Sequence, residues 1–180
     1  MDDPCVYSNM HKNRQPDIGG SAPAGGNPGR PVGYRELRLE DYFLGRATGE
    51  GVFQDLMGRV RREFSIETQG RWDGDVFVLD EHFLYRDGAT EHRQWRATKV
   101  GERRYEARAH DVVGVARGVC DDNTIRWTYV MRVPVGSRLI KLKFDDRMFL
   151  QRDGVLLNIS DAKKFGLKVG RLCLAFRKAE

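Results

Sequence analysis

The stretch 71–100 contains the feature that most constrains the fold, namely two runs of alternating apolar and polar residues joined by Arg86-Asp87-Gly88. A three-residue hairpin loop built from a type I turn and a bulge needs a left-handed residue in its third position, and Gly88 provides it. This turn pairs Tyr85 with Ala89, which fixes the register of the two predicted strands. The pairs expected on the apolar face are Phe83 with Glu91, Glu81 with Arg93, Leu79 with Trp95 and Phe77 with Ala97. An acidic and a basic residue are therefore expected opposite each other among apolar neighbours.

The alternation continues from residue 51 towards the C-terminus and is interrupted by Gly or Asp about every 8–14 residues. Short strands separated by such turn signals are typical of antiparallel barrels and sandwiches. We predict an all-β fold with about nine or ten strands. Because most connections are short and closure removes the exposed edges of a sheet, a single antiparallel up-and-down barrel is favoured over a Greek-key sandwich.

A second Arg-Asp-Gly turn at 152–154 fixes another register by the same reasoning. The expected pairs are Leu150 with Leu156, Met148 with Asn158 and Asp146 with Ser160. We also expect a bulge at Asp145-Asp146 and a helical turn over 160–164 with Ser160 as its N-cap. Asp146, Asn158 and Ser160 would form an inward polar group that either satisfies its own hydrogen bonds or orients a polar substrate.

Residues 1–33 are rich in Gly and Pro and contain few apolar residues, so we interpret them as a disordered tail before a barrel domain at 34–180. The segment 35–44 has a short helical pattern and is expected to form a lid across one end of the barrel. No apolar run approaches the roughly 18 residues of a membrane span. The N-terminus lacks the basic-then-apolar order of a signal peptide, so we expect a cytoplasmic protein, and an envelope lipoprotein only if the true start differs.

Basic residues exceed acidic ones, 31 against 26, but both signs are interspersed along the folded part. A mixed solvated surface explains this pattern, and no nucleic acid partner is expected. Positive charge is concentrated near the C-terminus, at Lys163, Lys164, Lys168, Arg171, Arg177 and Lys178. These residues form either a solvated face or a weak docking surface for an anionic membrane.

Glu81 and Arg93 are the first candidate site, because each is flanked along its predicted strand by residues of the apolar face. A buried ion pair contributes little net stability. Its presence is therefore weak evidence that the pair stabilises the fold, and fair evidence that the pair has a specific role. The pair is either a structural ion pair near the barrel mouth or an anchor. As an anchor, Arg93 would hold a carboxylate or phosphate with two nitrogens while Glu81 orients its guanidinium group.

Many aromatic residues are expected on the inward faces of the strands. They are Trp72, Trp95, Trp127, Tyr85, Tyr105, Tyr129, Phe64, Phe77 and Phe83. Such rings either pack a closed core or line a partly open pocket for an elongated apolar ligand, as in barrels of this size.

No motif of a known enzyme class is present, since the sequence has no Gly-x-Ser-x-Gly elbow, no His-Glu-x-x-His and no glycine loop for a phosphate or dinucleotide. The first hairpin register places His82 opposite His92 and Asp80 opposite Gln94 on the outer face, where a third strong metal ligand is not assured. We therefore predict no metal and no cofactor. We assign no catalytic residues, and the absence of known catalytic motifs favours a protein that is not an enzyme.

Eight short motifs carry a resemblance over about residues 39–178. They are LEDYF at 39–43, GVFQD at 51–55, WDGD at 72–75, LDEHFLYRDG at 79–88, RQW at 93–95, DVVGVARG at 111–118, FDDRM at 144–148 and KFGLKVG at 164–170. Jointly they resemble a bacterial family of domains of unknown function, DUF3833. The resemblance implies a lipocalin-like barrel, and members are often lipoproteins or encoded near genes for fatty-acid modification such as cyclopropane fatty acid synthases. It brings no established catalytic residues, and this chain lacks a lipoprotein signal before Cys5 and the Gly-x-Trp of true lipocalins.

We hypothesise a small lipocalin-like barrel that binds a lipid or fatty-acyl-like apolar molecule, as an accessory to fatty-acid or membrane-lipid modification. The predicted ligand-binding residues are Glu81, Arg93, Trp95, Tyr85, Trp127, Asp146 and Asn158. One alternative is an enzyme acting on such a lipid, with Glu81 as acid, Asp146 as base and Arg93 as anchor. Another is an accessory protein of a membrane-bound enzyme that binds through its basic C-terminal face.

Overall fold

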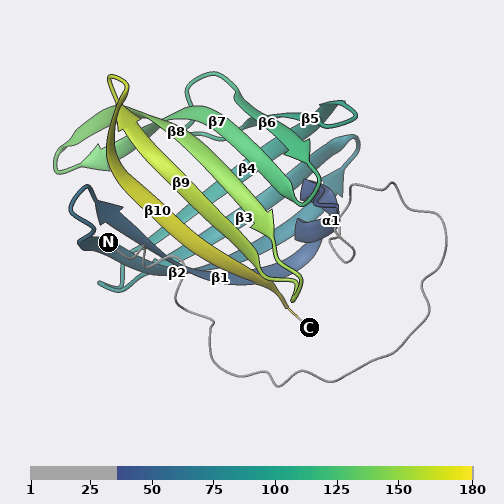
Figure 1. Ribbon diagram of the computed structural model, residues 1–180, viewed down its shortest axis with the longest axis horizontal. Coiled ribbons are helices and arrows are strands. Elements are labelled where there is room, and N and C mark those ends of the chain that lie inside the picture. Colours follow the sequence, from purple (N-terminus) through teal and green to yellow (C-terminus); the bar gives the residue numbers. More distant parts are fainter. Residues whose placement is uncertain (1–35, 180) are drawn as a thin grey trace, which may run out of the picture. The chain divides into compact units, whose positions relative to one another are not determined.

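The computed structural model describes residues 36–179, which form one closed barrel with a short helix at its start (Figure 1). The elements are α1 (Leu39–Phe43), β1 (Gly45–Asp55), β2 (Val60–Asp73), β3 (Val76–Tyr85), β4 (Thr90–Gly101), β5 (Arg104–Arg108), β6 (Ala116–Asp121), β7 (Thr124–Val135), β8 (Arg138–Leu150), β9 (Leu156–Lys164) and β10 (Leu167–Lys178). Each strand pairs antiparallel with its neighbours in the sequence, and β1 also pairs with β10. The predicted all-β up-and-down barrel is confirmed, with ten strands in the described part of the chain.

The predicted disordered tail, 1–33, lies outside the described residues, and the start of the barrel domain at residue 34 stays a prediction. Within residues 36–179, no helix has the length and apolar character needed to cross a membrane.

Both Arg-Asp-Gly turns produce the registers predicted from the sequence. At the first turn, the Tyr85 N–H donates to the Ala89 carbonyl at 2.9 Å, and Gly88 has a φ of 83°. The resulting pairs are Phe83–Glu91, Glu81–Arg93, Leu79–Trp95 and Phe77–Ala97. The pairs at the second turn are Leu150–Leu156, Met148–Asn158 and Asp146–Ser160. Because glycine adopts the left-handed conformation without strain, one residue in each turn fixes which side chains face the interior.

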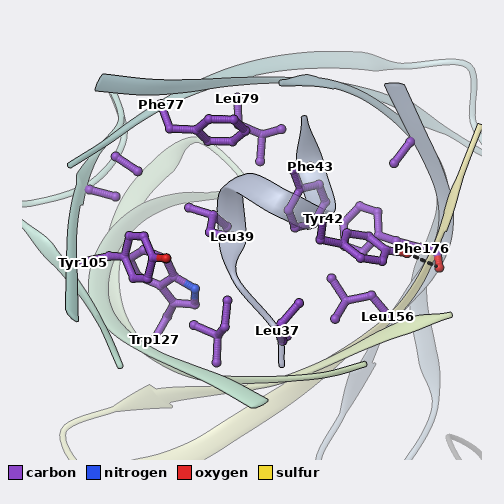
Figure 2. Packing of buried hydrophobic residues seen from close by; sticks show 14 of the residues in the cluster. Leu37, Leu39, Tyr42, Phe43, Phe77, Leu79, Tyr105, Trp127, Leu156 and Phe176 are labelled. Carbon is purple, nitrogen blue, oxygen red and sulfur yellow. Dashed lines mark hydrogen bonds between the residues drawn. The ribbon is translucent and has the colours of Figure 1, made fainter. Parts of the chain in front are cut away.

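The residues just before β1 close one end of the barrel from the inside (Figure 2). Phe43 is 1% exposed and packs edge-on against Phe176 of β10, with 5.1 Å between the ring centroids. The Tyr42 hydroxyl donates to the Phe176 carbonyl at 3.0 Å, and the Leu37 N–H donates to the Asp122 carbonyl at 2.8 Å. The predicted lid is therefore a plug, held by buried apolar side chains and by hydrogen bonds to a strand and a turn.

Gly70 on β2 allows the end of the plug to approach the barrel wall. A Cβ atom at this position would lie 2.0 Å from the Phe43 carbonyl oxygen and 2.7 Å from the Phe77 ring. Leu44, the residue after α1, forms a backbone bridge with Gly70. Only glycine therefore lets the chain after α1 run directly against β2.

Two local predictions are wrong. Residues 160–164 are not a helical turn but the second half of β9, in which the Ser160 hydroxyl bonds Asp146 instead of capping a helix. β8 has no bulge at Asp145-Asp146, because these residues pair regularly with Asp161 and Ser160. The continuous ladder satisfies the backbone groups that a cap would otherwise have to satisfy.

Trp72 is the one exception among the aromatic residues expected to face inward. It follows the same alternation as Phe64 and Ile66 on β2 but is 46% exposed. Its ring lies edge-on against Phe77 near the end of the strand, beyond the position where the plug contacts Gly70. The other predicted inward rings are buried or half-buried.

Candidate functional site

The barrel contains an open cavity of about 620 Å³. Its walls run from Leu39 and Phe43 at the plug to residues of the β1–β2 and β7–β8 hairpins at the opposite end. The aromatic part of the wall consists of Phe43, Phe53, Phe64, Phe83, Tyr85, Trp95, Trp127, Tyr129, Phe144 and Phe176. All seven residues predicted to bind a ligand line this cavity, while their role in binding stays a prediction.

Arg93 of β4 lies among three carboxylates. Its Nε donates to Asp111 Oδ2 at 2.8 Å, and its Nη2 donates to Glu91 Oε1 at 2.7 Å. Glu81, the partner predicted from the sequence, is the most distant of the three, with 3.5 Å between Arg93 Nη1 and Glu81 Oε2. Burial alone disfavours the charged guanidinium group, but the carboxylates raise the pKa of Arg93 above its usual value. Arg93 is therefore charged, and each of its three nitrogens already has a protein carboxylate nearby.

Glu81 and Glu91 are each held by an aromatic side chain as well. Trp95 Nε1 donates to Glu81 Oε2 at 3.1 Å, and the Tyr85 hydroxyl donates to Glu91 Oε2 at 2.8 Å. Burial raises the pKa of Glu81, against the opposing effect of Arg93. Burial and the hydrogen bond to Glu91 raise the pKa of Tyr85 to about 12, so its hydroxyl stays protonated and donates.

Asp146 of β8 is the centre of a second polar group in the cavity wall. The Tyr129 hydroxyl donates to Asp146 Oδ2 at 3.0 Å, and the Ser160 hydroxyl donates to Oδ1. The nearby Asn158 side chain acts, like these two hydroxyls, to lower the pKa of this carboxyl group. Despite these hydrogen bonds, burial raises the pKa of Asp146 to about 6. The three polar residues predicted to meet here do so, and Asp146 can exchange a proton near neutral pH.

The two polar groups are close enough to influence each other. The Trp95 and Tyr129 rings pack edge to face with 5.5 Å between their centroids, which links β4 to β7. Asp111 and Asp146 both act to raise the pKa of Glu81, as expected for like charges that share a buried site. The cavity wall as a whole carries four carboxyl groups, those of Glu81, Glu91, Asp111 and Asp146, and four guanidinium groups, those of Arg61, Arg62, Arg93 and Arg132.

Sequence reasoning missed Asp111 and the role of the Tyr129 hydroxyl in this centre. Asp111 lies in the connection between β5 and β6, where no alternating pattern indicates the direction of a side chain. Tyr129 is expected from the sequence only as an inward ring. Its inward position on β7, next to the strand that carries Asp146, was the available signal for a hydrogen bond.

The outer face of the β3–β4 hairpin brings His82 and His92 together, with 4.5 Å between the stacked rings. His92 Nε2 lies 3.2 Å from Asp80 Oδ1, and Asp80 is also bonded by Arg71 and Gln94. Across residues 36–179, no group of three or more His, Cys, Asp and Glu side chains is arranged to hold a metal ion. The Asp80 carboxylate is thus shared among three polar neighbours on the outer surface.

Three solved structures with this fold have little sequence similarity to the chain. S-type phycobiliprotein lyase CPES from Guillardia theta has a TM-score of 0.58 at 9% identity, over 80% of this chain and 94% of the other. Rv2717c from M. tuberculosis has a TM-score of 0.53 at 13% identity, over 77% and 94% of the two chains. A protein of unknown function from the DUF3598 family of Nostoc punctiforme has a TM-score of 0.55 at 17% identity, over 84% of this chain and 53% of the other. At these identities the similarity establishes the fold, a lipocalin-like barrel.

No curated protein matches the sequence significantly. The family model of DUF3833, proteins of unknown function, matches residues 33–178, which is most of the chain. The motifs that resemble this family lie within the matched range, and the barrel implied by the resemblance is the one observed. The chain therefore belongs to the DUF3833 family.

Proposed function

We propose that the barrel binds an apolar small molecule or lipid in its cavity. The observation that carries this proposal is the cavity itself, about 620 Å³ in volume, walled mainly by aromatic and aliphatic side chains and open opposite the plug. Small-molecule sites typically have volumes of about 300–1,000 Å³ and apolar walls with a few placed polar groups. A barrel built only for stability would fill its interior with side chains, because protein cores leave few voids larger than a water molecule.

Two small residues leave part of this space on the wall near the plug. Ala97 of β4 and Ala107 of β5 are directly paired, and both are buried and line the cavity. Leu79 and Trp95, which are paired on β3 and β4, line the same cavity with much larger side chains. A pair of alanines within such a wall leaves space for a ligand, and this supports the proposal that the cavity binds one.

Filling this space tests the proposal. Ala97→Phe places a ring in the cavity, whereas Thr98→Phe adds the same ring to the exposed face of the same strand. Wild type and Thr98→Phe should bind a long-chain apolar probe with a change in tryptophan fluorescence, because Trp95 and Trp127 line the cavity. Ala97→Phe should weaken binding by roughly tenfold or more, which corresponds to about 1.4 kcal/mol.

Native mass spectrometry of the purified protein provides a second measurement, in which we expect a co-purified lipid. Absence of probe binding to the wild type, or equal binding by the two variants, would contradict a ligand in the cavity.

The side chains exposed at the open end of the barrel support the proposal of a second partner, an anionic lipid surface. Large exposed apolar side chains lie on its hairpins, namely Leu56, Met57, Leu139, Phe165 and Leu167. Phe165 is 92% exposed and Met57 is 77% exposed. Apolar side chains that gather at one end of a soluble domain indicate contact with a partner surface.

Basic residues accompany these apolar side chains. The segments 132–141 and 163–168 each contain three Lys or Arg residues and no acidic residue. Near an anionic membrane, each Lys or Arg contributes about 1 kcal/mol of attraction. Only part of the C-terminal basic group predicted from the sequence lies at this end, because Arg177 and Lys178 are at the far end of β10.

Vesicle sedimentation tests this partner. We expect vesicles that contain phosphatidylglycerol to bind the protein at low salt, and phosphatidylcholine vesicles to bind it weakly, since added salt screens the attraction. Phe165→Ser should weaken the association, whereas Val119→Ser, at an exposed residue of β6, should not. Equal effects of the two substitutions would contradict docking by the open end.

A further inference from the structure

Three hairpins that are next to one another around the open end of the barrel share a composition. They connect β1 to β2, β7 to β8 and β9 to β10, and their turns lie at the end away from α1 (Figure 1). Their segments 56–62, 132–141 and 163–168 each contain three Lys or Arg residues and no acidic residue. The β3–β4 hairpin differs, because its segment 84–91 has one basic and two acidic residues. One side of the open end is therefore basic, and it is also the side with the large exposed apolar residues.

The β7–β8 hairpin connects this side of the open end to the interior through apolar side chains. Val135 lines the cavity although it is 53% exposed, and Leu139 on the same hairpin is 69% exposed. Val133 and Met131 follow on the same face of β7 and also line the cavity, where Met131 is only 6% exposed. This stretch of the inward face of β7 is therefore apolar from the exposed rim to the buried interior.

The turn between β9 and β10 contains a residue that folding alone does not favour. Phe165 and Gly166 form a two-residue turn in which both φ angles are positive, 51° and 80°. Asn or Gly is preferred at the first position of such a type I′ turn, because a bulky side chain is strained in the left-handed conformation. The Phe165 ring is also 92% exposed, with the Nζ atom of the adjacent Lys164 4.8 Å from its centroid. A strained and exposed aromatic residue indicates contact with a partner surface.

On the basis of the cavity binding and membrane docking described under the proposed function, we propose that the two are steps of one activity, the transfer of a lipid between a bilayer and the cavity. The exposed apolar residues of the three hairpins enter the bilayer interface, while the basic residues beside them lie against anionic head groups. The mouth of the cavity then faces the bilayer. An acyl chain passes along β7 without exposing its methylene groups to water, which is unfavourable for each of them. The ligand is thus a membrane lipid, taken from the bilayer and not from solution.

Transfer kinetics distinguish direct contact from passage through water. The protein is loaded with cis-parinaric acid, which is excited by energy transfer from Trp95 and Trp127 in the cavity wall, and is mixed with excess acceptor vesicles. If the probe leaves through water, the rate at which energy transfer is lost does not depend on the vesicle concentration. We expect a rate proportional to the concentration of phosphatidylglycerol vesicles. It should be roughly tenfold lower with phosphatidylcholine vesicles or at high salt, because both weaken the charge attraction.

Phe165→Asn separates contact with the bilayer from binding in the cavity. Asn accepts the left-handed conformation, so the melting temperature should equal or exceed that of the wild type. The affinity for cis-parinaric acid should stay within about twofold, because Phe165 does not line the cavity, but transfer to phosphatidylglycerol vesicles should slow by roughly fivefold or more. Val119→Asn is the matched control. Val119 is 49% exposed on β6, outside the three hairpins, so this variant should keep the wild-type transfer rate.

The outcomes test cavity binding and transfer separately. If the wild type does not bind cis-parinaric acid, cavity binding is overturned and transfer with it. If the wild type binds the probe but releases it at a rate independent of the vesicle concentration, transfer by contact is overturned and cavity binding stands. Equal transfer rates in Phe165→Asn and Val119→Asn would overturn contact through the β9–β10 turn. A melting temperature of Phe165→Asn below that of the wild type would overturn it too, because the ring would then be retained for folding.

Discussion

The plug end of the barrel and the centre of its cavity contain similar aromatic residues but differ in how their polar groups are paired. At the plug end, the Tyr105 hydroxyl donates to Glu40 at 2.6 Å, and the Tyr42 hydroxyl donates to the Phe176 carbonyl at 3.0 Å. In the centre, one guanidinium group, that of Arg93, lies among three carboxylates. Two further oxygen atoms there have no partner among the described residues.

This difference separates the part of the molecule that stabilises the fold from the part that reduces its stability. Full burial of a large apolar side chain contributes about 1.5–3 kcal/mol, and the plug buries Leu37, Leu39 and Phe43 together. Like charges and unpaired acceptors in a buried site are unfavourable, and natural proteins retain such conflicts mainly at functional sites. Substitutions at the plug should therefore only destabilise, whereas some substitutions in the centre should stabilise.

Arg93→Met should have the largest effect, a loss of about 3–5 kcal/mol, because it leaves buried carboxylates without their cation. Glu81→Gln is the informative comparison. Glu81 is the most distant partner of Arg93, at 3.5 Å, and burial already raises its pKa, so the loss should stay below about 1 kcal/mol. Urea denaturation at neutral pH measures both values. Equal losses would mean that the two residues form an isolated pair and that Asp111 and Glu91 contribute little.

Phe43→Ala should lower the free energy of unfolding by roughly 3–4 kcal/mol, because the ring is 1% exposed and its removal leaves a void in the plug. Phe165→Ala makes the same chemical change at a ring that is 92% exposed at the open end. It should change stability by less than about 0.5 kcal/mol. A small loss in Phe43→Ala, comparable with that control, would show that the plug is not where stability is concentrated.

The sequence predicts the wall of the barrel well because the decisive signals there are local. One glycine in each Arg-Asp-Gly turn sets the register, so the positions of Glu81 opposite Arg93 and of Asp146 opposite Ser160 follow from a few adjacent residues. Alternation of apolar and polar residues likewise indicates which side chains face inward. The seven predicted site residues line one cavity for this reason.

Features that depend on distant parts of the chain could not be predicted in the same way. Asp111 reaches Arg93 from a connection without alternation. The plug depends on a hydrogen bond from Tyr42 to Phe176, which is 134 positions later in the sequence. Ser160 shows the opposite error, because its local preference for capping a helix is overridden by strand pairing of β9 with β8 and β10.

The smallest of the three effects concerns Asp146, which faces the cavity and whose pKa burial raises from 3.8 to about 6. The folded protein therefore binds this proton more tightly than the unfolded chain does. The associated stability is fully present below about pH 3.8 and is lost as the pH rises through about 6. The loss amounts to about 2–3 kcal/mol at neutral pH. Asp146→Asn resembles the protonated form, so it should remove this loss and be more stable than the wild type at about pH 7.5.

Asp145, on the outer side of the same strand, provides a control of opposite sign. Burial acts to raise its pKa, but the hydrogen bond from Lys163 and the nearby charges of Lys143 and Lys163 together outweigh burial and lower it. The stability from Asp145 is therefore present above its ordinary value of 3.8 and is lost as the pH falls through the lowered one. At about pH 7.5, urea denaturation should show Asp145→Asn to be less stable than the wild type and Asp146→Asn to be more stable. If Asp146→Asn gains nothing, the centre of the cavity does not carry the unfavourable charge that distinguishes it from the plug end.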